Sequence, residues 1–283
     1  MSDQFPPVNA PKYRIEADIC ARTEIGPTRS ENQDAVMVAA AVGVASGTRL
    51  SWSGVVPGRG VAAAVVDGMG GYAGGSDAAA MVATELARAA LDQNSERWDE
   101  WFSSLSLRVA AAGEAWGTPD MGATAALIGF GATGLVVVNV GDCRVYRAVG
   151  GHLGLLTVDD RTDDPDSSSV TQALGGHRRL DAHAWRQGYV GGKERFILCS
   201  DGVWSTLDAN VLRDYCTAEA APGHIVDAIA EAVYERGSRD NASIIVIDLT
   251  ATATYGEEAP DASTLHTSSV NVEADTIEET TGS

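Results

Sequence analysis

The sequence predicts a layered α+β domain in which helices cover the faces of an antiparallel sheet. Apolar runs follow one another at 124–130, 135–142 and 144–150 with only short glycine turns between them, which is hairpin spacing. Three other segments place their apolar residues on one face at helical spacing. We expect these helices to lie against the sheet.

The first helix is expected to begin at the cap residue Ser76, the second spans about 95–115, and the third follows Pro222 and ends near Gly237. The aromatic residues of the second helix have the spacing of a buried stripe, which favours core packing over a ligand site. The stripes consist of Val82, Leu86, Ala89 and Ala90, then Trp98, Phe102, Leu105 and Val109, then Ile225, Ile229, Ala232 and Val233.

Four aspartates mark the ends of strongly apolar runs. Asp67 ends VAAAVVD, Asp142 ends LVVVNVGD, Asp201 follows RFILCS, and Asp240 precedes NASIIVIDL. Runs of this kind are typical of buried strands. Carboxylates converging at the mouths of buried strands repel one another unless something neutralises them. Divalent cations held by oxygen ligands are the simplest remedy, so the sequence predicts a metal site.

Arg29 and Asp34 lie in TRSENQDAV, before another apolar run. Arginine beside acids is the usual chemistry for a phosphate bound next to a metal, because guanidinium pairs with two phosphate oxygens. With no nucleophilic serine or cysteine motif, the pattern indicates hydrolysis by a metal-bound water.

Two other interpretations stay open. Asp67-Gly68 and Asp201-Gly202 are each common turn dipeptides when taken alone. The segment GMGGYAGG also resembles a nucleotide-binding turn. It lacks Gly-Lys-Ser/Thr and would set Asp67 against a pyrophosphate, and the consecutive strands of 121–150 do not fit a dinucleotide fold.

The composition of the chain narrows the function classes. With 283 residues and a net charge of −19, nucleic acid and anionic membrane surfaces are poor partners. No apolar stretch reaches the roughly 18–20 residues of a membrane span, and the start lacks signal-peptide features. Scattered cysteines suit a reducing compartment. We expect a cytoplasmic monomer.

The two ends of the chain differ from the middle. Residues 1–12 are expected to be a flexible N-terminus, and residues 13–250 the structured domain. Residues 251–283 hold seven acids, no Lys or Arg and many Thr and Ser, so we expect a disordered acidic tail.

Seven segments in order resemble the motifs of the protein phosphatase 2C family, metal-dependent protein serine/threonine phosphatases, here of the short bacterial kind. They are TRSENQDAV (28–36), VVDGMGGYAGG (65–75), MGATAALIGF (121–130), VVNVGDCRVYR (137–147), VTQALGG (170–176), FILCSDGVWSTL (196–207) and RDNASIIVID (239–248). The resemblance implies a central β-sandwich of two antiparallel sheets flanked by helices, with the metal site at one end and residues 13–250 as the catalytic domain.

The resemblance also implies a metal cluster of Mn²⁺ or Mg²⁺. Asp67 would bridge two ions, the carbonyl of Gly68 would complete one of them, and Asp201 and Asp240 would bind the other. Asp142 would help to bind a third, weaker ion together with Asp201. A water bridging the two main ions would then attack phosphorus in a phosphoserine or phosphothreonine.

Two further residues complete the implied catalytic set. Arg29 matches the phosphate-binding arginine, and Asp34 matches an acid that orients metal-bound water. The partner would be a phosphorylated protein, prepared by a cognate serine/threonine kinase. A catalytically weak pseudophosphatase, acting as a phosphoprotein-binding or regulatory module, is the alternative.

The chain departs from the family pattern at four places. Gln33, Tyr72 and Ala123 stand where relatives often have an acid, a histidine and a threonine. Only residues 161–169 occupy the position of a flap subdomain. We expect this short polar loop to be exposed, to leave the metal site more open and to change substrate selection.

Overall fold

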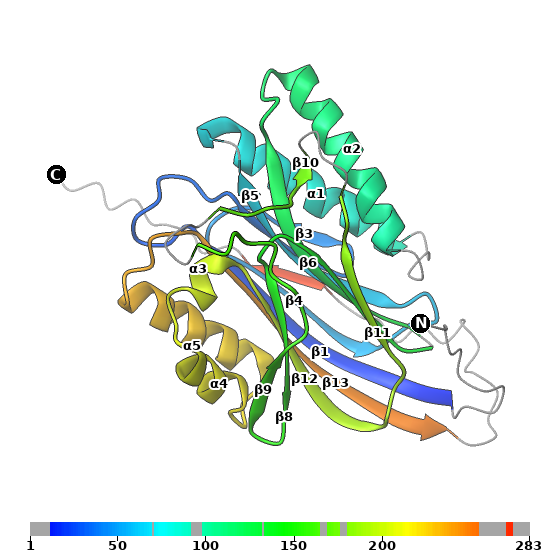
Figure 1. Cartoon of the computed structure of the whole chain (residues 1–283). Helices are drawn as coiled ribbons and strands as arrows, with labels where there is room; N and C mark the ends of the chain where they lie inside the picture. The colour runs from blue at the N-terminus through cyan, green and yellow to red at the C-terminus, as the bar shows by residue number, and fades with distance from the viewer. Residues whose placement is uncertain are drawn as a thin grey trace.

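The computed structural model describes residues 12–69, 71–91, 98–131, 133–164, 169–175, 180–254 and 270–273. Within them, two antiparallel sheets pack face to face, with helices outside each sheet (Figure 1). The predicted α+β class and β-sandwich are confirmed.

The first sheet contains the two longest strands at its centre. Its order is β14 (Val270–Glu273), β4 (Thr48–Val55), β1 (Lys12–Glu24), β13 (Ala242–Thr254), β12 (Gly192–Cys199), β8 (Arg144–Val149) and β9 (His152–Leu155). The outer face of this sheet is covered by α3 (Asp201–Trp204), α4 (Ala209–Cys216) and α5 (Pro222–Glu235) (Figure 1).

The second sheet carries most of the predicted hairpin strands. Its order is β11 (His183–Gln187), β7 (Leu135–Val140), β6 (Gly122–Phe130), β5 (Val61–Met69), β2 (Asp34–Val38) and β3 (Ala41–Gly43), and β10 (Leu174–Gly175) pairs with β6. The long helices α1 (Gly71–Leu91) and α2 (Trp98–Trp116) lie on its outer face (Figure 1).

Strands β6 and β7 and the first half of β13 are mostly apolar because both of their faces are buried. In β13, Ile245 and Ile247 point into the core between the sheets, whereas Ile244 and Val246 pack against the helices. This two-residue alternation places successive side chains on opposite faces. Continuous apolar runs therefore identified the inner strands of the sandwich.

One predicted helix start is wrong. Helix α1 begins at Gly71, five residues before the expected cap. The hydroxyl of Ser76 donates to Glu31 Oε1 at 2.7 Å instead of capping the helix. The glycine-rich turn after β5 is already helical, so Ser76 lies in the second turn, where no free backbone N–H needs a cap.

The expected disordered tail is wrong for two short segments. Residues 251–254 continue β13, with Thr254 opposite Lys12 at the start of β1. Val270–Glu273 add β14 to the edge of β4. Backbone hydrogen bonds to an open sheet edge need no apolar composition, which is why the polar sequence gave no sign of them. The rest of the tail, and residues 1–11 of the N-terminus, lie outside the described residues.

The four cysteines are all free and buried, so no disulfide frames the domain. None of the helices within the described ranges combines the length and the apolar character needed to cross a bilayer.

Candidate metal and phosphate site

The strand ends that carry the predicted aspartates meet at one end of the sandwich. Asp34 opens β2 and Asp67 lies in β5, and the two are direct partners in the antiparallel ladder. Asp142 follows β7, Asp201 begins α3 directly after β12, and Asp240 precedes β13. Like charges placed opposite each other in a sheet are destabilising. The structure thus assembles all five predicted acids in one cluster.

Asp67 lies at the centre of this cluster. Loss of hydration, followed by the charges of the four other aspartates, raises its pKa well above the ordinary value. Its side chain is nevertheless partly exposed, so a ligand from solvent reaches it. A carboxylate in such surroundings is stabilised by a bound cation.

Asp201 provides the clearest sign that a cation belongs here. Its Oδ1 atom is buried and has no hydrogen-bond partner among the described residues. Burial, followed by the charges of Asp240 and Asp142, raises the pKa of Asp201 to about 7. An unpartnered buried carboxylate oxygen is costly, and a metal ion would satisfy it.

Asp34 is almost fully buried, at 2% exposure. The hydroxyl of Ser200 donates to its Oδ2 at 2.7 Å. Burial raises the pKa of Asp34 to about 7, although the hydrogen bonds from Ser200 and Ser243 lower it. Asp34 is therefore held as a supporting acid beneath the more exposed ones, the place expected of a residue that orients a water.

Arg29 lies beside Asp240, and its side chain is 47% exposed. Its Nη2 donates to Asp240 Oδ2 at 2.5 Å, and its Nε donates to the carbonyl of Arg239 at 3.1 Å. The structure thus brings the predicted phosphate-binding arginine to the acid cluster. In this arrangement the guanidinium neutralises Asp240, which would have to release it in order to bind a metal.

Asn241 fastens the segment that carries Arg29, and the sequence reasoning missed it. Its Oδ1 accepts from the backbone N–H of Gln33 at 2.9 Å, and its Nδ2 donates to the carbonyls of Ile25 and Glu31 at 2.9 Å each. The side chain is buried, so these bonds fix residues 25–33 to the start of β13. The only available signal was its position directly after Asp240.

Asp142 has a partner that was also missed. Its Oδ2 accepts from Arg161 Nη1 at 3.1 Å, and its backbone carbonyl accepts from Trp204 Nε1 at 3.0 Å. Burial raises the pKa of Asp142, and the Arg161 charge lowers it. The acid expected to serve a third metal ion is thus already paired with a cation from the short loop.

Gly68 is packed too closely for any side chain. A Cβ at this position would lie 2.0 Å from the carbonyl oxygen of Gly75 and 2.7 Å from that of Gln33. The Gly68 N–H donates to the Gln33 carbonyl at 2.9 Å. The sheet edge and α1 therefore require glycine here, and the role of its carbonyl as a metal ligand stays a prediction.

The acids fit divalent cations chemically, but their side chains are not yet arranged around one. Across the described residues, no three acidic, histidine or cysteine side chains form a ready coordination shell. Asp240 is turned to Arg29, Asp34 to Ser200 and Asp142 to Arg161. Oxygen-only donors with one orphaned oxygen suit Mg²⁺ or Mn²⁺, and loading would require side-chain rotation.

The segment in place of a flap is short and tied at its base. Arg161 and Val170 form an isolated antiparallel bridge. Thr162, Asp163 and Asp164 are exposed, as predicted, and residues 165–168 lie outside the described residues. Of the other departures, Ala123 of β6 pairs with Gly68 of β5, and the Tyr72 side chain lies outside the described parts of the structure.

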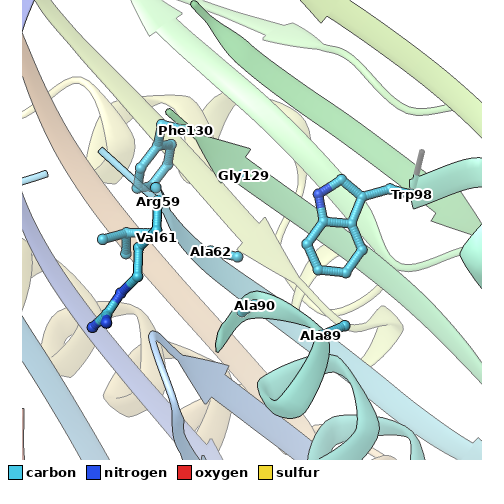
Figure 2. Close-up of a pocket in the computed structure, with 9 residues that line it drawn as sticks. Arg59, Val61, Ala62, Ala89, Ala90, Trp98, Gly129 and Phe130 are labelled. Atoms are coloured by element: carbon cyan, nitrogen blue, oxygen red, sulfur yellow. The ribbon is translucent and has the colours of Figure 1, made fainter. Parts of the chain in front are cut away.

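A small hollow lies at the start of β5, the opposite end of this strand from Asp67, and Figure 2 shows residues that line it. Its volume is only about 10 Å³, which is room for roughly one water molecule. It is lined by Arg59, Gly60, Val61, Ala62, Ala89, Ala90, Trp98, Gly129 and Phe130. This size excludes a phosphorylated substrate from this hollow.

The cysteines near the cluster have no nucleophilic character. Burial raises the pKa of Cys143 well above its ordinary value and raises that of Cys199 as well. A thiol that stays protonated is a poor nucleophile. Both side chains lie in the core, which agrees with their interpretation as packing residues.

Comparison with known proteins identifies the class. The family model for protein phosphatase 2C matches residues 49–232. The serine/threonine protein phosphatase PstP of Mycobacterium tuberculosis is 28% identical over 265 residues, which cover 85% of this chain and 46% of PstP. A probable protein phosphatase 2C of Oryza sativa subsp. japonica is 28% identical over 206 residues, covering 56% of this chain and 51% of that protein.

Solved structures share the fold. PppA, described as a key regulatory component of T6SS in Pseudomonas aeruginosa, superimposes with a TM-score of 0.68 at 25% identity, covering 83% of this chain and 98% of PppA. The catalytic domain of PstP in complex with two manganese ions gives a TM-score of 0.65 at 23% identity, covering 83% of this chain and 99% of that one.

The matched residues make up more than half of the sequence, and the chain belongs to the protein phosphatase 2C family. It spans about half the length of the curated relatives that it matches.

Proposed function

We propose that this chain hydrolyses phosphoserine and phosphothreonine in proteins, in a reaction that depends on Mn²⁺ or Mg²⁺. The observation that supports this most strongly is the convergence of five aspartates, one with an orphaned buried oxygen, beside an exposed arginine. Family membership supports the same reaction.

The metal ions would be held by the more exposed acids. Asp67 would bridge two ions, the carbonyl of Gly68 would complete one shell, and Asp201 and Asp240 would hold the second ion. When bound, two divalent ions lower the pKa of a shared water and neutralise charge on the phosphoryl oxygens. The two-ion arrangement is proposed from the family and from the oxygen-only chemistry of the donors.

Arg29 would bind the phosphate of the substrate. Its side chain is about half exposed, and its Nε donates a hydrogen bond to the Arg239 carbonyl. This hydrogen bond orients the guanidinium. The donors of Arg29 that do not hold the Arg239 carbonyl would pair with two phosphoryl oxygens and stabilise the charge that develops on them. Asp34, fixed by Ser200, would orient the attacking water by accepting its hydrogen bond.

The substrate is proposed to be a folded phosphoprotein prepared by a serine/threonine kinase. The loop of residues 161–169 is too short to form a subdomain that would contact the substrate residues around the phosphate. Selection would then depend on the body of the substrate or on a docking partner. We propose that the chain acts as a monomer in the cytoplasm. A non-catalytic phosphoprotein-binding role is not favoured, since every acid expected to hold metal is present in the cluster.

The test is hydrolysis of an aryl phosphate and a phosphothreonine peptide with Mn²⁺, with Mg²⁺ and with a chelator. Release of phosphate with either metal and none with chelator is expected. An Asp67→Asn variant should lose several orders of magnitude in rate, whereas Asp214→Asn, an exposed acid on α4, should not change it. Equal rates with metal and with chelator would sink the proposal.

A further inference from the structure

Asp142 lies on the side of the acid cluster next to the shortened loop. Its side chain is only 4% exposed, and its Oδ2 accepts from Arg161 Nη1 at 3.1 Å. A carboxylate this deeply buried is not stable as an anion without a partner, and a guanidinium is always charged. The pair is therefore a lasting part of the cluster and differs from exposed surface ion pairs, which contribute little.

Arg161 is carried on a fixed segment of the loop. The preceding residue, Asp160, is buried, and its Oδ2 accepts from the backbone N–H of Gly141 at 2.9 Å. Its Oδ1 accepts from Gln172 Nε2 at 2.8 Å and lies 2.9 Å from His183 Nε2. These contacts join the loop to the end of β7 and to β11, so the backbone that presents Arg161 is held in place.

The guanidinium of Arg161 also packs over the ring of Trp204. It lies 5.1 Å from the centre of the Trp204 ring, and the indole Nε1 of Trp204 donates to the Asp142 carbonyl. The neighbouring Arg144 stacks on the same ring at 3.7 Å and donates to both oxygens of Asp159. Cation–π contact orients a guanidinium without neutralising it, so the charge of Arg161 remains directed at the acids.

The influence of Arg161 extends beyond Asp142. It lowers the pKa of Asp201 as well, against the raising effect of burial. One positive charge therefore acts on both acids that a third metal ion would need. A divalent ion bound to Asp142 and Asp201 would lie close to the Arg161 guanidinium, which cannot lose its proton. The two positive charges would repel each other.

We propose that Arg161 takes the place of a third metal ion in this chain. The guanidinium neutralises Asp142, so the protein binds two divalent ions and admits a third only by displacing Arg161. Arg161 is thus a positioning residue that supplies permanent positive charge at the open side of the site. This inference rests on the proposed two-metal function, and it reassigns Asp142 from a metal ligand to an arginine partner.

The test is the stoichiometry of Mn²⁺ on the full chain, measured by equilibrium dialysis with free Mn²⁺ read from its EPR signal. The wild type and Arg161→Lys, which keeps the charge, should bind two ions. Arg161→Met, which keeps the length of the stem but removes the charge, should gain a third ion bound at least tenfold more tightly than any third ion of the wild type. Adding Asp142→Asn to Arg161→Met should return the count to two.

Arg147→Met is the matched control. Arg147 has a similar exposure, 27% against 25% for Arg161, and pairs from β8 with Glu194 of the neighbouring strand β12, outside the aspartate cluster. The Arg147→Met variant should bind two Mn²⁺ ions, like the wild type. If Arg161→Met fails to fold by near-UV circular dichroism, Arg161→Gln replaces it, and the wild-type count still decides the question.

Three ions on the wild type, or a third ion bound equally by the wild type and Arg161→Met, would overturn the role of Arg161 and leave the proposed function intact. No Mn²⁺ on the wild type would overturn both. Two on the wild type, three on Arg161→Met and two on the double variant support the inference.

Discussion

Replacing Asp201 by asparagine should stabilise the protein at pH 8 when metal is absent and destabilise it relative to the wild type when Mn²⁺ is saturating. The pKa of Asp201 is raised from 3.8 to about 7, first by burial and then by neighbouring carboxylates. The folded chain therefore holds a proton that the unfolded chain releases at lower pH, and ionisation of the folded state at pH 8 is unfavourable.

The size of the effect follows from that difference in pKa. One pKa unit corresponds to about 1.4 kcal/mol, so the upper limit is about 4 kcal/mol at pH 8. Asp201 is partly exposed, and the repulsion is distributed over several carboxylates. We therefore expect about half of this free energy, which corresponds to roughly 4–8 °C in melting temperature for a domain of this size. Since Oδ1 makes no hydrogen bond to the described residues, the amide loses none there.

The assay is thermal unfolding in chelator at several pH values. The advantage of Asp201→Asn should shrink as the pH falls from about 7 toward 3.8, because the folded acid stays protonated while the unfolded acid regains its proton. Asp214→Asn, a change at an exposed acid, should stay within about 0.5 kcal/mol of the wild type throughout. With Mn²⁺ at 100 times its dissociation constant, the wild type should gain about 2.7 kcal/mol and the variant less. A variant that melts no higher than the wild type at pH 8 without metal would refute the reasoning.

Three more outcomes are expected. Arg29→Ala should lower kcat/KM on a phosphothreonine peptide by about 10²–10³-fold. The affinity for Mn²⁺ should not fall, because Asp240 is no longer paired with Arg29. A parallel loss of metal affinity would contradict this. Urea unfolding in chelator should show the wild type losing stability as the pH rises from about 4 to 7, since the unfolded chain releases protons that acids with raised pKa values keep in the folded state, and Mn²⁺ should flatten that slope. Iodoacetamide should leave hydrolysis unchanged, since burial raises the pKa of Cys143 and Cys199; rapid inactivation would show an accessible thiolate.

The inner strands and the acids at their ends were predictable because one physical cause produces both signals. Where a strand is buried on two faces, as in most of β5 and the first half of β13, it is mostly apolar, so Asp67 and Asp240 stand out as the points where such strands reach the site. The hydrogen bonds that shape the cluster were not predictable in this way. Ser200 reaches Asp34 across 166 positions, and Asn241 reaches Glu31 across 210.

Local patterns failed where tertiary contacts decide the outcome. Serine is a favoured residue type for a helix cap. However, the glycines before Ser76 already belong to α1, and the Ser76 hydroxyl donates to Glu31. Strand β14, with the sequence VNVE, alternates apolar and polar residues over only four positions, which is too short a pattern to distinguish it within a polar segment, and it joins the sheet edge through its backbone. Arg161 looked like one residue of a polar loop, and only the fold shows that Asp160 anchors this loop beside Asp142.

The most direct test is a titration in which bound Mn²⁺ and hydrolysis of a phosphothreonine peptide are measured on the same metal-free sample. Turnover should be absent at first, should rise as the second ion binds, and should vanish again in chelator, while Asp67→Asn binds metal poorly and stays inactive. Full turnover after exhaustive removal of metal, or turnover by Asp67→Asn equal to that of the wild type, would contradict the account.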